Sequence, residues 1–128
     1  MPPEVGLTAT LSLTVSDDDT AVALGSGTVP VLGTPRVVAL CEEATVAAIS
    51  SSLGDGQTTV GSKISLEHLA PTPVGGVVEA SAVLEKVEGR RLTFTVKVSD
   101  ERSLLAEGRI VRIAVDEDTF VARAQGDG

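Results

Sequence analysis

The segment from residue 34 to about residue 53 constrains the fold most, because it is the only long stretch of this 128-residue chain with a helical pattern. It opens with Thr34-Pro35, which reads as an N-cap followed by a proline at the first helical position. Gly54-Asp55-Gly56 ends it. Apolar residues occupy nearly its whole circumference, as expected of a helix that is covered on most sides. The rest of the chain is therefore expected to wrap around this helix.

Alternation of apolar and polar residues, which is typical of strands, fills most of the remaining chain. It covers residues 5–15 before the helix and, after it, residues 58–70, 77–87, 91–99 and 104–115. In the second of these strands the alternation predicts one buried face made of Val60, Ser62, Ile64, Leu66 and His68. Residues 20–33 are interrupted by glycine and proline and predict a loop or a short strand.

One helix and five strands with short connections predict an α+β domain, in which an antiparallel meander curls around the helix. A single helix cannot cover the whole sheet, so we expect an edge and an open face to be satisfied in a homodimer or a higher oligomer. The length favours one domain spanning residues 1–128. Residues 1–4 and 125–128 are expected to be flexible.

Composition and charge exclude several classes of function. The net charge of −8 argues against a nucleic-acid partner, and the two aromatic residues, Phe94 and Phe120, cannot form a base-stacking platform. No apolar run approaches the roughly 20 residues that a membrane span requires. The N-terminus has no signal-peptide pattern, and the single Cys41 precludes an intrachain disulfide. We therefore expect a cytoplasmic protein that binds neither nucleic acid nor membrane.

Three polar residues stand where a dry core is expected. His68 is the only histidine of the chain, and Glu42 and Glu43 interrupt the apolar helix. Burial of such groups is costly, so together with Thr34 they suggest a site that handles protons. Each also has an ordinary structural reading: Thr34 as the N-cap, the acidic pair where the helix meets solvent, and His68 as a satisfied residue at a strand end.

Other chemistry-bearing residues have weaker claims. Cys41 adjoins Glu42, but neighbouring side chains in a helix diverge by about 100°, and a buried free cysteine is usually a small hydrophobic residue. Asp17-Asp18-Asp19 lacks the spacing of a calcium loop and reads as a solvated turn. With one histidine and one cysteine, a zinc site is not expected.

The spacing of three of these four residues is more specific than any single motif. Thr34, Glu42 and His68 are separated by eight and then twenty-six positions. This set resembles the catalytic Thr, Glu and His of the fluoroacetyl-CoA thioesterase branch of the hotdog superfamily, over roughly residues 34–115. Four flanking segments agree with it: Glu42-Glu43-Ala44, Thr59-Val60-Gly61, His68-Leu69-Ala70-Pro71-Thr72-Pro73 and Val87-Glu88-Gly89-Arg90-Arg91-Leu92.

The resemblance implies the hotdog fold and an acyl-CoA thioesterase whose hydrolytic residues are Thr34, Glu42 and His68. It implies that the backbone N–H of Gly61 helps to hold the thioester oxygen. It also places Arg112, a basic residue of the last strand, at the site without a defined role. The only cofactor implied is the CoA of the substrate itself.

Two further features bear on the substrate. That branch closes its fluoroacyl pocket with aromatic side chains in the loop before the helix, whereas residues 20–33 contain no aromatic residue. We therefore expect a different short or branched acyl group. Arg90 and Arg91 at the hairpin could meet the phosphates of CoA, and they could equally be ordinary surface charges.

Thioester hydrolysis suits these residue types. The reaction requires a nucleophile or activated water and stabilisation of an oxyanion, and Thr34, Glu42 or a water could attack. Thr34 and Glu42 lie about 12 Å apart along a regular helix and cannot touch. Either the chain folds back at Thr34 or two subunits share the site, and we predict a site at a dimer interface.

Two other functions remain open at this point. A non-catalytic protein of the same fold could bind an acyl thioester. A hotdog enoyl-CoA hydratase is the other alternative, but such hydratases usually carry an Asp-x-x-x-x-His pairing at the helix start, which this sequence lacks.

Overall fold

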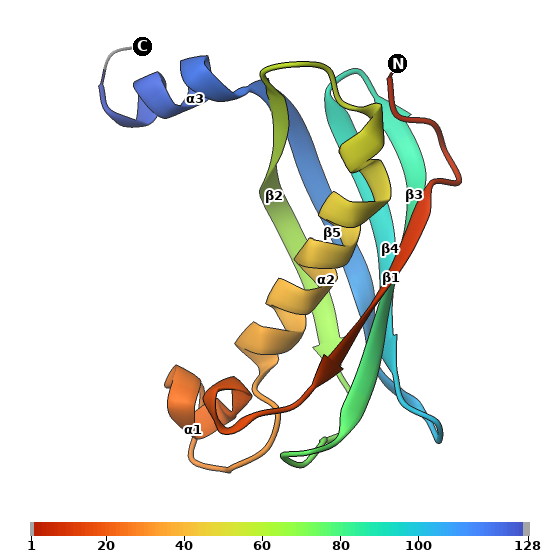
Figure 1. The fold of residues 1–128 in the computed structure, drawn as a ribbon, viewed down its shortest axis with the longest axis vertical. Helices are drawn as coiled ribbons and strands as arrows, with labels where there is room; N and C mark the ends of the chain where they lie inside the picture. Colours follow the sequence, from red (N-terminus) through yellow and green to blue (C-terminus); the bar gives the residue numbers. More distant parts are fainter. Residues whose placement is uncertain (1, 127–128) are drawn as a thin grey trace.

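The computed structural model describes residues 2–126, and one antiparallel sheet curves around one long helix (Figure 1). The sheet strands are β1 (Thr8–Thr14), β2 (Gln57–His68), β3 (Val77–Glu88), β4 (Arg91–Ser99) and β5 (Leu104–Asp116). The helices are α1 (Ala21–Leu24), α2 (Thr34–Ile49) and α3 (Glu117–Ala124), with short 3₁₀ turns η1 (Asp17–Asp19) and η2 (Ser50–Ser52). No helix among the described residues is both long enough and apolar enough to cross a membrane.

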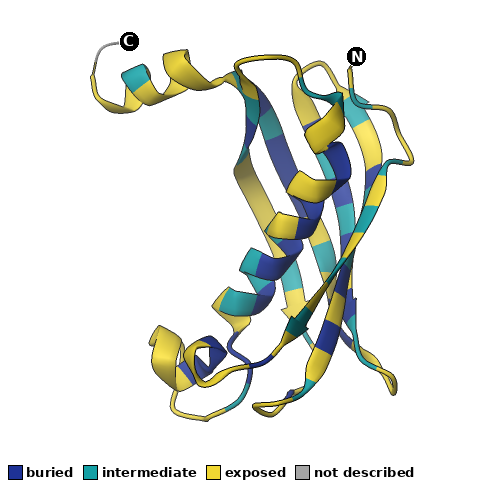
Figure 2. Cartoon of the chain, viewed as in Figure 1, coloured by how far each residue is buried: buried dark blue, intermediate teal, exposed yellow. Residues whose placement is uncertain are grey.

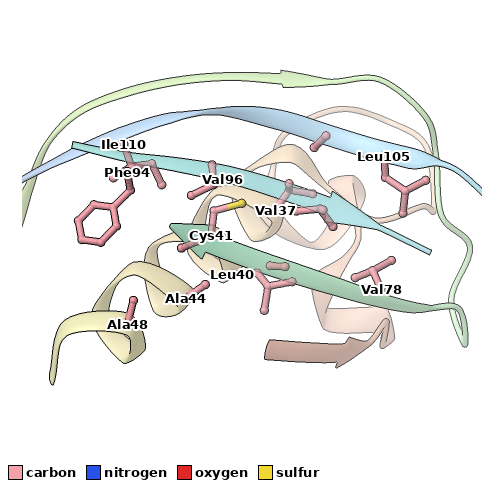
Figure 3. Close-up of a cluster of buried hydrophobic side chains, with 14 of the residues drawn as sticks. Val37, Leu40, Cys41, Ala44, Ala48, Val78, Phe94, Val96, Leu105 and Ile110 are labelled. Carbon is pink, nitrogen blue, oxygen red and sulfur yellow. The ribbon is translucent and has the colours of Figure 1, made fainter. Parts of the chain in front are cut away.

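The core lies between α2 and the concave face of the sheet. Figure 3 shows the sulfur of Cys41 and the small side chain of Ala44 facing the sheet, close to Phe94 and Val96 of β4. These four side chains are buried, and α2 contacts all five strands. The small residues of α2 allow the helix and the sheet to approach each other closely, with the single large ring of Phe94 filling the space toward the end of the helix.

The helix is covered less completely than its sequence predicts. Val46 and Ala47 are exposed, and Figure 2 shows an uncovered stripe along the side of α2 that faces away from the sheet. The apolar circumference is therefore buried on one side only within a single chain. An uncovered apolar stripe of this kind is typical of a surface that contacts another molecule, and the expected homodimer stays a prediction.

The strand order is β1-β3-β4-β5-β2, so the predicted meander is correct for β3, β4 and β5 but wrong for β2. After β2, residues 69–76 bend away from it, and Leu69 and Ala70 both donate backbone hydrogen bonds to the carbonyl of Leu105. β2 therefore pairs with β5 at the far edge, and β3 pairs with β1. The segment that links β2 to β3 contains Pro71 and Pro73 and is too long and too restricted for a tight hairpin.

β2 contains an irregularity that changes which residues share a face. Its register against β5 shifts between Gly61 and Lys63, so that Ser62 is an extra residue in the strand. The predicted single face of Val60, Ser62, Ile64, Leu66 and His68 is therefore wrong in its first half. Thr59 and Gly61 face the helix before the bulge, and Leu66 and His68 face it afterwards.

The start of α2 also differs from the prediction by one residue. Gly33 is the N-cap, and Thr34 and Pro35 occupy the first helical positions. Thr34 is thus not used as a capping residue, and its hydroxyl is free for another partner. The ordinary reading of Thr34 as an N-cap is wrong.

Three other segments depart from expectation. The acidic turn at residues 17–19 is not simply solvated, because Asp19 is buried and accepts hydrogen bonds from the backbone and hydroxyl of Ser16 and from Arg36. Residues 20–33 contain the short α1 as well as the expected loop. The helix α3 was not predicted. The expected flexibility of residues 1–4 and 125–128 stays a prediction, and residues 1, 127 and 128 lie outside the described residues.

Candidate active site

Thr34 and His68 meet where the start of α2 approaches the end of β2. The Oγ1 of Thr34 lies 2.8 Å from the Nδ1 of His68, within hydrogen-bond distance. Thr34 is exposed and His68 is half-buried, so both remain accessible from an open pocket of about 280 Å³. Apolar residues of the loop before α2 and of the segment after β2, among them Val29 and Leu69, form much of its wall.

The surroundings of His68 favour its neutral form. Burial lowers the pKa of the imidazole below its ordinary value, and a backbone hydrogen bond with Ala70 opposes this in part. A neutral imidazole has one nitrogen free to accept a proton. The Thr34–His68 pair therefore has the geometry of a hydroxyl next to a base.

Glu42 takes part in a second cluster, on the open side of α2. Its Oε2 lies 3.2 Å from Nη1 of Arg112, whose side chain is buried. Arg112 also donates from Nε to the hydroxyl of Thr59 at 2.9 Å and from Nη2 to the carbonyl of Thr59 at 3.0 Å. Three hydrogen bonds thus fix the guanidinium, and the guanidinium fixes the carboxylate.

Gly61 leaves room for this carboxylate. A Cβ at Gly61 would lie 2.7 Å from Oε2 of Glu42, closer than such atoms approach. Gly61 is directly opposite Arg112 in the β2–β5 register, so all three groups converge on one place. Burial lowers the pKa of Arg112, while its ion pair with Glu42 acts in the opposite direction. The result is a carboxylate held close to the backbone of Gly61.

The two clusters are well separated within one subunit. Along α2, Thr34 and Glu42 are separated by about 12 Å, from the helical rise. Along β2, the seven residue-to-residue steps from Gly61 to His68 correspond to about 23 Å of extended strand. The pockets that contain the two clusters have no residue in common. The structure brings Thr34 to His68, and Glu42 to Gly61 and Arg112, but it does not join the two groups within one chain.

The other acidic residue of the pair is engaged elsewhere. Glu43 accepts a hydrogen bond at 2.8 Å from Arg36, which also pairs with Asp19 at 3.1 Å. This network ties the start of α2 to the turn before α1. Only Glu42 of the acidic pair is turned toward Gly61, and its catalytic role stays a prediction.

Cys41 is fully buried in the core. Burial, with the nearby charge of Glu42, raises the pKa of its thiol to about 12. The thiolate is therefore scarce at neutral pH, which argues against Cys41 as a nucleophile.

The remaining predicted residues lie apart from both clusters. Arg90 and Arg91 are exposed at the β3–β4 hairpin, and Arg91 lies with Lys63 and Arg109 on the outer face of the sheet. Their proposed contact with CoA phosphates stays a prediction. Within residues 2–126, no three His, Cys, Asp or Glu side chains gather as a metal site would require.

One residue of the site, and one residue of the neighbouring ion-pair network, were missed in the sequence. Thr59 holds Arg112 through both its hydroxyl and its carbonyl, and its position two residues before Gly61 on one strand would have indicated a shared face. Arg36 lies seven positions before Glu43, two helical turns away on the same side of α2, which would have indicated their pairing.

Comparison with known proteins gives a consistent result. A family model described as FlK, fluoroacetyl-CoA-specific thioesterase, matches residues 15–118. A fluoroacetyl-CoA thioesterase of Streptantibioticus cattleyicolor is 34% identical over 95 residues, which cover 74% of this chain and 68% of the relative. The chain belongs to the family of fluoroacetyl-CoA-specific thioesterases.

Solved structures extend this result to the whole fold. A structure of the fluoroacetyl-CoA thioesterase FlK has a TM-score of 0.93 at 28% identity and covers 100% of this chain and 99% of its own. A Thermus thermophilus protein of the thioesterase superfamily has a TM-score of 0.89 at 26% identity, over 98% and 93% of the two chains. The predicted α+β hotdog fold is thereby confirmed.

Proposed function

We propose that this protein is a thioester hydrolase that cleaves a small acyl-CoA into the free acid and CoA. The observation that carries the proposal is the Thr34–His68 pair at 2.8 Å, facing an open pocket, in a member of a thioesterase family. A hydroxyl held against a neutral imidazole is a means of activating an oxygen nucleophile. A variant of FlK has been solved with fluoroacetate and CoA, which supports CoA as the carrier here.

The two clusters suggest a separate catalytic role for each group. His68 accepts a proton through Nδ1, either from Thr34 or from a water that Thr34 orients. Glu42, held by Arg112, positions the attacking water or attacks the carbonyl itself. The N–H of Gly61 faces the developing oxyanion. The carbon–sulfur bond then breaks, and CoA leaves as a thiolate that needs little acid assistance.

These groups require two subunits to act together. β2 has a neighbouring strand on one side only, and the adjacent face of α2 is uncovered. Antiparallel pairing of two β2 strands about a twofold axis between Ile64 and Ser65 would set Gly61 opposite His68 of the partner subunit, at a strand spacing of about 4.8 Å. Each homodimer would then contain two sites, and each site would combine Glu42, Gly61 and Arg112 of one subunit with the Thr34–His68 pair of the other.

The acyl group is small. The pocket beside His68 is lined by aliphatic side chains, and the loop of residues 20–33 contributes no aromatic ring. A short or branched aliphatic acyl chain fits such a wall better than a fluoroacyl group selected by aromatic packing. A cytoplasmic location stays a prediction from the sequence.

Release of free thiol from a panel of short, branched and aromatic acyl-CoAs tests the proposal. Wild-type protein is expected to hydrolyse at least one short acyl-CoA, and Glu42→Gln and His68→Ala are each expected to lower kcat by about 10² or more. Glu43→Gln is the matched control. Glu43 is the next residue along α2, and its hydrogen bond is with Arg36, outside the Glu42–Arg112 cluster.

The alternatives give different results in the same experiment. Tight binding of acyl-CoA without thiol release across the panel would indicate a non-catalytic binding protein. Hydration of a 2-enoyl-CoA without release of CoA would indicate a hydratase. Unchanged rates in both the Glu42 and His68 variants would show that the chemistry lies elsewhere in the molecule.

A further inference from the structure

The C-terminal helix α3 is anchored at its start and projects away from the sheet. The carboxylate of Asp116 accepts a hydrogen bond from the N–H of Thr119 at 2.9 Å and caps the helix. The N–H of Glu117 donates to the carbonyl of Gly56 at 2.9 Å, which fixes the helix to the loop before β2. From there α3 extends past the β2 edge (Figure 1).

The helix presents apolar side chains that its own subunit leaves uncovered. No residue of α3 is buried, and Phe120 and Val121 are 38% and 48% exposed. A helix of eight residues is not stable through local interactions alone, because helical stability in proteins comes mainly from packing of an apolar face. A surface that covers Phe120 and Val121 is therefore expected in the functional assembly.

The proposed dimer determines where this surface lies. Asp116, the residue before α3, is paired with Gln57 at the start of β2. In the antiparallel β2 pairing described above, Gln57 falls opposite the point where residues 69–76 of the partner subunit leave the edge strand. α3 is about 12 Å long, sufficient to extend from β5 across both edge strands. Its middle would therefore lie over the partner's segment of residues 69–71.

We propose that α3 of one subunit packs over the pocket of the other, where Phe120 forms a wall of the acyl-binding site. This inference rests on the proposed dimeric thioesterase and adds a residue that sets acyl specificity. The surface around the partner's pocket is also apolar. Leu69 and Val29 line the pocket beside Thr34 and His68 and are 51% and 53% exposed. Apolar side chains left open on both parts would bury each other.

The aromatic content of the chain supports this role for Phe120. The chain has only two aromatic residues, and Phe94 is fully buried in the core behind α2. The loop before α2 has none. Phe120 is therefore the one phenyl ring left to shape a pocket, and in the proposed dimer that pocket belongs to the partner subunit. Truncation of this ring would enlarge the pocket and shift preference toward longer acyl chains.

Disulfide trapping tests the contact independently of catalysis. In a Cys41→Ala background, Phe120→Cys combined with Leu69→Cys is expected to yield a covalent dimer under mild oxidation, resolved on a non-reducing gel. Phe120→Cys combined with Val77→Cys is the matched control, because Val77 is equally exposed but lies at the start of β3, next to β1 and away from β2. Equal cross-linking in the two pairs, or none in the first, would overturn the docking of α3.

The acyl profile of Phe120 variants tests the specificity. Phe120→Ala is expected to shift the ratio of kcat/KM values for acetyl-CoA and a branched five-carbon acyl-CoA by about 10-fold toward the larger substrate, and Phe120→Leu is expected to shift it less. An unchanged ratio, with the cross-link formed, would refute a role in specificity. Absence of hydrolysis by the wild type, with the cross-link formed, would instead refute the proposed function and leave the contact established.

Discussion

At the residue scale, the absence of one methyl group determines where Glu42 can lie. The carboxylate occupies the space that a Cβ at Gly61 would fill, and Arg112 holds it there. The neighbouring atom is the far end of a flexible side chain, so the carboxylate can move away without unfolding the protein. Gly61 is thus a position where side-chain size affects activity more than stability.

Gly61→Ala is therefore expected to lower kcat by about 10-fold or more, because a displacement near 1 Å at a catalytic group has costs of this order. The urea midpoint of unfolding is expected to change little. Gly54→Ala is the matched control, since a Cβ there meets nothing within 4 Å. Equal activity of the Gly61 variant and the wild type would exclude Glu42 from the reaction.

His68 gives the site a defined pH dependence. Burial lowers the pKa of its imidazole, so the neutral form persists below the ordinary value of about 6.5. We expect kcat/KM to fall at acid pH with a midpoint below 6.5, measured by thiol release with a thiol reagent suited to low pH. A midpoint at or above 6.5 would contradict the neutral-base role.

The same lowered pKa affects stability. Well above pH 6.5 the imidazole is neutral in both folded and unfolded chains, and the contribution of His68 to stability does not depend on pH. As the pH falls, the unfolded chain binds the proton first, so the free energy of unfolding falls through the folded pKa. His68→Gln is expected to reduce this slope in urea titrations.

At the element scale, the sequence predicted periodicity well and pairing poorly. The β4 strand was expected at residues 91–99 and lies at Arg91–Ser99, because its alternating residues are buried on one face. The extra residue Ser62 in β2 could not be foreseen, since a bulge depends on the partner strand β5 rather than on local pattern. The position of β2 at the sheet edge also depends on which strand it pairs with. The only sign of this position in the sequence is the polar composition of the strand.

The β2–β5 pairing depends on a second glycine, Gly108. A Cβ at this position would collide with the backbone carbonyl of Ser65 and lie 2.8 Å from the Cα of Leu66. Gly108→Ala is therefore expected to reduce the free energy of unfolding by about 2 kcal/mol or more, measured by urea denaturation. Activity would be lost together with the edge strand that carries His68. A stability within about 0.5 kcal/mol of wild type would show that β2 can move without cost.

At the scale of the whole molecule, the three predicted catalytic residues fall into two groups that one chain cannot join. The sequence predicted a shared site from a single distance, the eight residues between Thr34 and Glu42. The structure adds an uncovered face of α2 and an edge strand with one neighbour. Neither the pairing of Glu42 with Arg112 nor the exposure of α3 could be predicted, since both arise from contacts between segments far apart in the sequence.

The shared site is tested most directly by mixing two inactive variants. Differently tagged subunits carrying Glu42→Gln and His68→Ala would be co-expressed and the mixed dimer purified, with each variant homodimer as a control. If each site uses Glu42 from one subunit and His68 from the other, the mixed dimer has one site with both substitutions and one with none. We therefore predict about half the wild-type rate of thiol release per dimer. A mixed dimer no faster than either variant homodimer, or an active wild-type monomer, would contradict the account.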